Sequence, residues 1–425
     1  MKTETFENLL KLSNAELKEK IKSITPISLE VLNSLKKLEV NKGFRKPKLG
    51  FYDHTIHIIG GGQKYGLSIL DLLKDYFEIT IIANKKVGLN DFKEWYGFDF
   101  KNIEIKVIDL EFFKDDFNLD PNKVMEGDDN PFEKISYESM NYDIFINNSM
   151  NEMVYSFSPV SILICHFPER RPDRYFYVDK YDYVVYNSKY TSEWIKNKWS
   201  IEPKIHIYPP VDMVPEKKTE KEKIILSVAR FEVGGSKRQL EMINAFKKMK
   251  KIYPEKMRDW RFVLIGGSGK ENPYLEKIKQ VSGVSDDIEI HVNISLRELR
   301  DYYMRSKIFW HMCGLNNNDP SLIEHFGMSI VEAMQNGLVP IVYDGGGQRE
   351  IVENNISGFR VKSQFELIMK TILLIDDEVM NKKMSENSIN RGKDFSIDVF
   401  NSRVRKFFIN ILKNDFKIND AEERL

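Results

Sequence analysis

Cysteine and long apolar runs are the two features that this sequence has least of. Only Cys165 and Cys313 occur, far apart and without a CxxC or Cys/His spacing, so neither a disulfide framework nor structural zinc is expected. No run approaches the roughly 18 apolar residues of a membrane-spanning helix. The N-terminal residues also lack the apolar core of a signal peptide. We therefore expect a cytoplasmic protein.

An excess of either charge is missing as well. The 64 basic and 64 acidic residues of the 425 give a net charge of zero. Nucleic acid is therefore not expected as the main partner, since no basic excess exists to displace its counterions. A local basic patch on a membrane-facing surface stays possible, so peripheral contact with the cytoplasmic membrane face remains open. The 42% hydrophobic content is normal for a chain with sizeable cores.

Apolar segments of strand length alternate with helical patterns over most of the chain. This alternation predicts α/β domains with parallel sheets covered by helices on both faces. The expected strands of the first half are Thr55–Ile59, Ile79–Ala83, Ile103–Ile108, Tyr142–Asn147, Ser161–Cys165, Tyr183–Tyr186 and Ile205–Tyr208. Those of the second half are Lys223–Val228, Arg261–Ile265, Ile288–His291, Ile308–His311, Val339–Tyr343 and Gly358–Val361. Two doubly wound, Rossmann-like domains facing a cleft follow from this order.

Composition changes suggest where the domains begin and end. We expect an N-terminal helical extension over 1–45, broken near Pro26, which packs on the body or contacts a membrane or partner. The first domain is predicted over 46–210 and the charged, Pro-rich linker over 211–222. The second domain is predicted over 223–395, followed by a C-terminal helix within 396–425. Residues 111–138 are acidic and are predicted to form an irregular insertion.

The stretch from Glu324 to Gly347 reads EHFGMSIVEAMQNGLVPIVYDGGG. Residues 328–335 suit a helix capped by Gly337, which places Glu324 in the preceding loop and Glu332 in the second turn. The free N–H groups and the dipole of such a helix start favour an anion. Two glutamates at this spacing are also common by chance, so ordinary core packing is an equal alternative for the segment alone.

Two further groups of residues follow predicted strands. Gly60, Gly61 and Gly62 lie between a strand and a helix, where glycines permit a tight turn and close approach of a phosphate or sugar, although the dinucleotide fingerprint is absent. His166 ends another strand and suits a hydroxyl or phosphate contact, or a structural role. A structural turn is likewise an alternative for the glycines.

The loop RFEVGGSK carries Arg230 and Lys237 at the end of the second domain's first strand. Two cations beside a helix start suit a diphosphate, while a solvated basic loop is the alternative, and Arg238 is a rival to Lys237. The helix after the loop is predicted to begin with a capping box of Ser236 and Gln239. No catalytic triad, Walker A motif or HExxH pattern appears, so neither metal nor cofactor is expected.

Together these residues resemble the GT-B glycosyltransferases of glycosyltransferase family 4. The resemblance covers roughly residues 50–415. It rests on the Gly61-Gly62 turn, His166, the PPVD of Pro209–Asp212, Arg230 with Lys237, the E-x7-E of EHFGMSIVE, and the GGGQREIVENNISGF run. The phrase from Trp310 to Gly327 is similar to α-mannosyltransferases of lipid-linked oligosaccharide assembly.

The resemblance implies metal-independent, retaining transfer from a nucleotide sugar, either a UDP- or a GDP-sugar, to a glycan or glycolipid acceptor. It implies that Glu324 contacts the donor sugar and Glu332 the ribose, while Arg230 and Lys237 neutralise the departing diphosphate and His166 contacts the sugar. It assigns donor binding to Gly61 and Gly62 and to backbone N–H groups of Phe326, Gly327, Met328 and Ser329. The first domain would then be the acceptor side, and the C-terminal helix within 396–425 would cross back onto it. A sugar-nucleotide epimerase and a catalytically silent subunit of a glycan-assembly complex remain alternatives.

Overall fold

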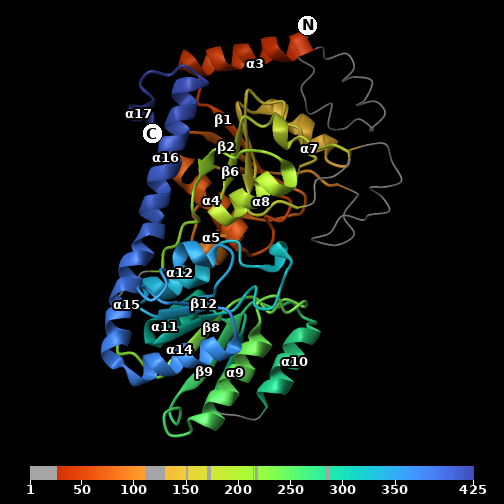
Figure 1. Ribbon diagram of the computed structural model, residues 1–425. Helices are drawn as coiled ribbons and strands as arrows, with labels where there is room; N and C mark the ends of the chain where they lie inside the picture. Colours follow the sequence, from red (N-terminus) through yellow and green to blue (C-terminus); the bar gives the residue numbers. More distant parts are fainter. Residues whose placement is uncertain are drawn as a thin grey trace. The chain divides into compact units, whose positions relative to one another are not determined.

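The computed structural model describes residues 26–110, 130–149, 152–169, 174–213, 215, 219–283 and 287–425. The chain divides into two compact units. Unit 1 takes the residues up to Asn187, Thr191–Ile207 and Asn401–Leu425, and unit 2 takes Ser188–Tyr190 and Tyr208–Phe400. Each unit holds one parallel sheet between helices, which confirms the predicted α/β class (Figure 1).

The described part of unit 1 contains a seven-stranded sheet in the order β3-β2-β1-β4-β5-β6-β7. The chain moves outward from β1 to β3 and then restarts at β4 on the other side of β1. This reversal between β1 and β4 is the point at which doubly wound sheets bind ligands. The strands are β1 (Lys48–Tyr52), β2 (Glu78–Ala83), β3 (Glu104–Val107), β4 (Ile144–Asn147), β5 (Val160–Cys165), β6 (Tyr183–Tyr186) and β7 (Ile205–His206).

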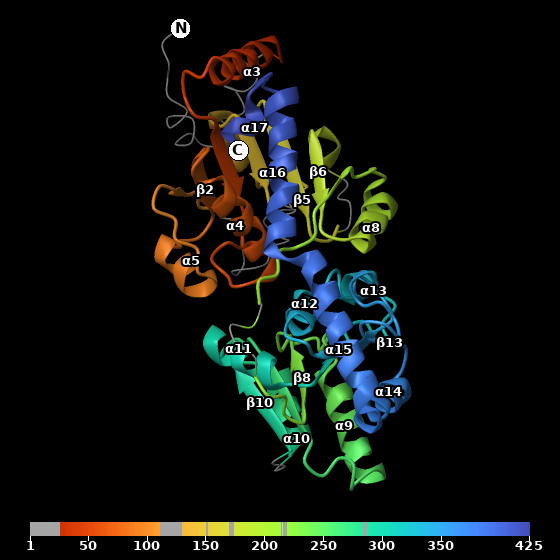
Figure 2. The same cartoon turned by 90° about the vertical axis from the view of Figure 1, so that its left-hand side faces the viewer.

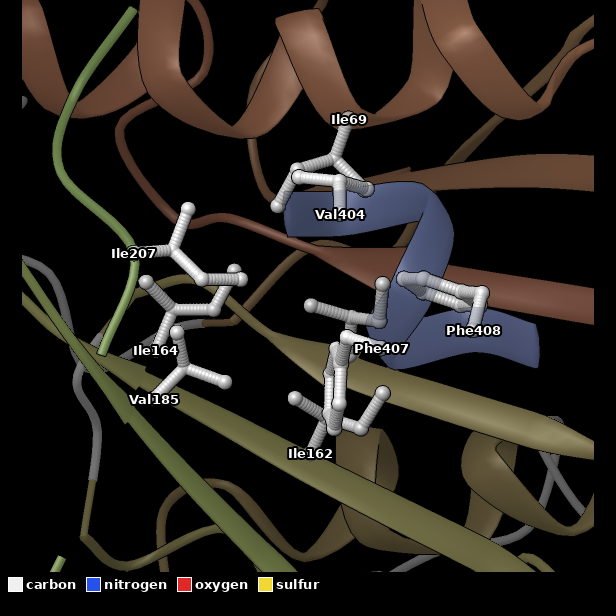
Figure 3. A pocket seen from close by; sticks show the side chains of 9 residues that line it. Ile69, Ile162, Ile164, Val185, Ile207, Val404, Phe407 and Phe408 are labelled. Carbon is white, nitrogen blue, oxygen red and sulfur yellow. The ribbon is translucent and has the colours of Figure 1, made fainter. Parts of the chain in front are cut away.

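Successive side chains along a strand point to opposite faces of the sheet, so the strands of unit 1 contribute to a core on each face. Phe145 and Leu163 face clusters on one side of the sheet. Ile162 and Ile164 face the other side, where helix α16 (Ile397–Asn414) lies along the sheet (Figure 2). A small apolar cavity remains there, as Figure 3 shows. Its lining is entirely aliphatic and aromatic: Ile69, Ile146, Ile162, Ile164, Val185, Ile207, Val404, Phe407 and Phe408.

The remaining helices of unit 1 are α3 (Pro26–Asn41), α4 (Gly61–Leu73), α5 (Leu89–Tyr96), α7 (Glu133–Glu138), α8 (Lys189–Trp199, whose first residues group with unit 2) and α17 (Ala421–Arg424), with short 3-10 turns η1 (Ser139–Asn141) and η2 (Val178–Lys180). Of these helices, α3 precedes β1, α17 follows α16, and the others lie between strands in the chain.

The described part of unit 2 contains a six-stranded parallel sheet in the order β10-β9-β8-β11-β12-β13. The strand order reverses between β8 and β11. Neighbouring residues again face opposite cores, with Trp310 packed among one cluster and Phe309 among the other. The strands are β8 (Ile224–Val228), β9 (Arg261–Gly266), β10 (Ile288–Val292), β11 (Ile308–His311), β12 (Val339–Tyr343) and β13 (Phe359–Val361).

Helices cover both faces of this sheet. Those packed on the Trp310 side are α9 (Gln239–Ile252), α10 (Pro273–Ser282), α14 (Gln364–Asp376) and α15 (Glu378–Gly392), while α11 (Leu296–Arg305) and α12 (Met328–Gln335) contribute to the other core. The short elements are α13 (Gln348–Ile351), η3 (Pro320–Leu322) and η4 (Lys393–Phe395).

Several local predictions are confirmed. Helix α12 has the predicted bounds, and Gly337 follows it at φ 76°, in the left-handed conformation that glycine adopts at low cost. Ser295 and Glu298 form a capping box at the start of α11.

The strand predicted at Thr55–Ile59 is wrong, because that segment forms turns and the first strand is β1, at Lys48–Tyr52. Gly50 has low strand propensity, so propensity alone does not predict a strand here. A Cβ there would lie 2.3 Å from the Tyr142 ring, so the strand needs the residue that strands usually avoid.

Three other expectations also change. The glycine run is the first turn of α4 itself rather than a loop before it. Ser236 does not cap α9, whose N-cap is Arg238 at φ 60°; its Oγ instead donates to Glu232. Part of the predicted irregular insertion is the helix α7. Residues 1–25 and 111–129, which hold the rest of the predicted extension and insertion, lie outside the described residues.

Within the described ranges, no helix combines the length and the apolar character needed to cross a bilayer.

Candidate active site

The reversal of strand order in unit 2 brings together residues that are distant in sequence. His311 is the last residue of β11, and the loop with Arg230 and Lys237 follows the neighbouring strand β8. The loop before α12 supplies Glu324. These positions lie at the carboxyl ends of adjacent parallel strands, where doubly wound sheets bind ligands.

A buried charge cluster forms at this edge, and we call Lys237, His311 and Glu324 the Glu324 cluster. The Lys237 Nζ and the His311 Nε2 each lie 2.9 Å from the same carboxylate oxygen, Oε2 of Glu324. The side chains are 18%, 2% and 16% exposed, respectively. The carboxylate is thus fixed from two sides while part of it stays accessible to a ligand.

The cluster holds its members in defined charge states. Burial by itself would raise the pKa of Glu324, but the Lys237 ammonium and the His311 hydrogen bond lower that pKa well below its usual value. Burial likewise opposes the charge of Lys237, yet Glu324 raises the Lys237 pKa above its usual value. An ammonium therefore faces a carboxylate throughout the neutral pH range.

Cys313 lies beside the cluster. Burial raises the pKa of its thiol to about 12, although Lys237 acts in the opposite direction. One ligand atom each from His311, Cys313 and Glu324 lies within 4.8 Å of the others, a combination that suits zinc in composition. In this structure the positive charge that pairs with the Glu324 carboxylate is the Lys237 ammonium.

The start of α12 is built on glycine. Gly327 adopts φ 113°, and a Cβ there would lie 2.6 Å from Ile330 Cδ1. Gly347 packs on the same loop, since its N–H donates to the Glu324 carbonyl at 2.8 Å and a Cβ would lie 2.2 Å from the His325 carbonyl oxygen. The first N–H groups of a helix, here those of Met328 and Ser329, have no acceptor within it. They therefore form a positive pole next to the Glu324 carboxylate.

A buried tyrosine fixes the side chain of Glu332, which lies on α12. The Tyr303 hydroxyl donates to a Glu332 carboxylate oxygen at 2.8 Å. Burial, together with the nearby Glu332 charge, raises the pKa of Tyr303 well above its usual value, so the phenol remains a donor. Sequence reasoning missed Tyr303, whose only signal was an aromatic residue on a helix with a polar face.

Arg230 is not part of the Glu324 cluster. Its guanidinium is 62% exposed and lies 2.9 Å from Glu232. The rival Arg238 contacts Glu241, so the structure places Lys237 rather than Arg238 at Glu324.

Unit 1 carries a second polar group at its own strand-order reversal. His166 follows β5, with its Nε2 3.3 Å from the Asn148 Oδ1, and the Asn148 amide donates to buried Asp53 at 2.6 Å. A Cβ on Gly62 would come within 3.2 Å of the His166 ring, so the glycine permits this close approach. Burial lowers the pKa of His166 to about 4, which keeps the imidazole neutral. Gly61 begins α4 in the same turn. Asp53 and Asn148 were not foreseen, because each stands just past a strand without a recognisable motif.

Comparison with solved structures defines the fold class. The chain matches the crystal structure of Anabaena Alr3699/HepE in complex with UDP and glucose, with a TM-score of 0.64, 14% identity, and coverage of 85% of this chain and 99% of that one. A glycosyltransferase from Rickettsia africae matches with a TM-score of 0.64 at 17% identity, covering 87% of this chain and 100% of that one. The fold is GT-B, as the sequence predicted.

Sequence comparison adds a family match in unit 2. Residues 211–391 match the family described as Glycosyl transferases group 1. A human protein named GDP-Man:Man(3)GlcNAc(2)-PP-Dol alpha-1,2-mannosyltransferase is 29% identical over 251 residues, or 53% of this chain and 49% of that protein. A trehalose synthase of Thermococcus litoralis is 24% identical over 256 residues, or 54% of this chain and 59% of that enzyme. The chain thus spans about half the length of the curated relatives it matches.

Proposed function

We propose that this protein is a retaining, metal-independent glycosyltransferase that moves a hexose from a nucleoside-diphosphate sugar to a glycan or glycolipid. The family match over residues 211–391 and the GT-B fold support the reaction class. The Glu324 cluster is the observation that carries the proposal, since it joins a fixed carboxylate, a buried ammonium and a helix start at one sheet edge.

The cluster suits the charge changes of glycosyl transfer. As the bond to the diphosphate breaks, negative charge grows on the leaving group, and a fixed ammonium with oriented N–H groups stabilises that charge without reorganisation. We assign this role to Lys237 and to the backbone of Phe326, Gly327, Met328 and Ser329. Arg230 is assigned to the outer part of the diphosphate, where its exposed guanidinium is free to reorient from Glu232.

The two glutamates take separate roles. Glu324 accepts hydrogen bonds from donor-sugar hydroxyls, because its carboxylate is ionised and 16% exposed. Glu332 accepts from the ribose hydroxyls while Tyr303 holds it from behind. A phosphate oxygen of the leaving group takes the acceptor proton, so the transfer needs no protein base.

In unit 1, neutral His166 and the α4 start at Gly61 and Gly62 bind sugar hydroxyls. An imidazole with a pKa of about 4 serves as a hydrogen-bond partner rather than as a counterion. These contacts are to the donor sugar, and we assign the acceptor to unit 1 as well.

GDP-mannose is the first donor to test, because the most similar relatives we describe include a mannosyltransferase named for GDP-Man. UDP-sugars come second, since the Anabaena structure contains UDP and glucose. A thermal-shift series with GDP, UDP and ADP, followed by their sugars, ranks the bases, because a ligand at about 100 times its Kd stabilises by about 2.7 kcal/mol.

The roles are tested with Glu324→Gln, which keeps the shape and removes the charge. Transfer should fall by about 100-fold or more, as for other preorganised polar groups at a reacting centre, while the bare nucleoside diphosphate still shifts the melting temperature. Unchanged turnover would contradict the assignment of Glu324. Incubating the nucleotide sugar without acceptor separates the alternatives, because an epimerase would convert it to another nucleotide sugar, an active transferase would hydrolyse it slowly, and a silent subunit would leave it intact.

A further inference from the structure

Helix α3 carries apolar residues on two opposite faces. One face packs on unit 1: Val40 is 1% exposed, the Asn33 amide donates to the Phe157 carbonyl, and the Lys36 ammonium donates to the Met140 carbonyl. A surface helix of a globular protein needs only this one apolar face. The second face therefore needs an explanation of its own.

The second face points away from the body of unit 1. Val31, Leu35 and Leu38 are 54%, 53% and 50% exposed. Their spacing of four and three residues aligns them in one stripe along the helix. Phe44, in the turn after the helix, is 77% exposed and continues the apolar surface. We call these four residues the α3 stripe.

Basic side chains gather at the C-terminal end of the stripe. Lys42 and Lys46 are exposed on either side of Phe44. Exposed Lys417 joins them from the C-terminal segment, because the Asn41 amide donates to the Lys417 carbonyl at 2.7 Å. Of the nearby acids, Glu39 is already bound by Arg45, 3.0 Å away. A positive cluster thus borders the stripe in a chain whose net charge is zero.

We propose that the α3 stripe and its lysines form a docking surface for an anionic lipid membrane. Aliphatic side chains with an aromatic residue, bordered by lysines, match the interior and the charged surface of a lipid leaflet. A second copy of this chain fits less well. Four side chains supply only part of the roughly 800 Å² per partner of a standard interface, whereas membrane insertion gains energy from each side chain separately.

The surface does not use the Glu324 cluster, so its test is independent of the proposed activity. The full chain is sedimented with vesicles of phosphatidylcholine mixed with phosphatidylglycerol, and with vesicles of phosphatidylcholine alone. Leu35→Glu places a charge at the centre of the stripe. Val379→Glu is the matched control, because Val379 is 81% exposed at the start of α15 in unit 2.

Wild type and Val379→Glu should sediment with the mixed vesicles, and Leu35→Glu should bind them about tenfold or more weakly. Lys42→Gln should weaken binding about fivefold at low salt, and this loss should shrink as salt screens the surface. Circular dichroism checks that each variant is folded.

Three outcomes would overturn the proposal. The first is a wild-type protein that binds neither vesicle, and the second is equal binding by Leu35→Glu and wild type. The third is a wild-type dimer in light scattering that Leu35→Glu converts to a monomer, which would identify the stripe as a contact between copies.

Discussion

Replacing Lys237 with methionine tests the electrostatics of the Glu324 cluster. Methionine keeps most of the side-chain volume but leaves the Glu324 carboxylate with His311 as its remaining side-chain partner in the cluster. Removal of one member of a fully buried ion pair costs about 3–5 kcal/mol. Since these two side chains keep 18% and 16% exposure, we expect the free energy of unfolding to fall by about 2–3 kcal/mol.

The pH dependence gives a second, signed expectation. The pKa of Glu324 is lowered in the folded state, so its contribution to stability is present above the ordinary value of 4.5 and is lost as the pH falls through the folded value. Lys237→Met removes a principal cause of the lowering. Wild type should therefore lose more stability than the variant as the pH falls below about 4.5.

Urea unfolding followed by circular dichroism measures both effects. Lys223→Met is the matched control, because Lys223 pairs with Asp259 on the surface, where the two side chains are 51% and 65% exposed, and its loss should cost less than about 1 kcal/mol. Adding Glu324→Gln to Lys237→Met should recover part of the loss. A coupling energy within about 0.5 kcal/mol of zero would refute the reasoning, because independent sites behave in that way.

Four other substitutions probe three separate features. Glu332→Ala should weaken nucleotide binding by about 10- to 100-fold in a thermal-shift titration, a loss typical of a charged hydrogen bond, and Tyr303→Phe should weaken it less; a fall in turnover alone would argue against the ribose role. Burial lowers the pKa of Lys221 to about 7, so the unfolded chain binds the extra proton between about pH 7 and 10.5, and wild-type stability should rise over that range by up to about 1.4 kcal/mol per pH unit. Lys221→Met should remove that slope in urea midpoints measured across this range. Val404→Ala enlarges the apolar cavity of unit 1 and should cost about 2 kcal/mol in the same assay; no change would mean that the wall collapses into the space.

The fold was predictable wherever local signals agreed. Val339–Tyr343 is apolar, follows a glycine-capped helix and precedes three glycines, so pattern and turn chemistry gave the correct bounds. The failure at Thr55–Ile59 shows the converse. The β-branched residues there have high strand propensity, while β1 contains Gly50, whose place is decided by the ring of Tyr142, more than ninety residues away in sequence.

Some residues of the candidate site were predictable, but the pairings between them were not. Glu324 and Lys237 were both chosen from the sequence, yet nothing local indicates that they share an ion pair across 87 positions. The exposed position of Arg230 could not be predicted either, because the sequence of a basic loop does not indicate whether its side chains point inward or outward. Contacts that depend on the order of strands in a sheet require that order to be known.

The return of the chain to unit 1 has a consequence for its synthesis. Val404, Phe407 and Phe408 cover isoleucines of β4 and β5 that are made more than two hundred positions earlier. While a ribosome is still producing unit 2, one face of the unit 1 sheet lacks the part of its cover that α16 supplies and exposes apolar side chains there. Unit 2, which is nearly continuous in sequence, can be completed first. A nascent chain of this protein is therefore exposed to aggregation through its first half until α16 emerges, and a chaperone that shields apolar strands would act in that interval.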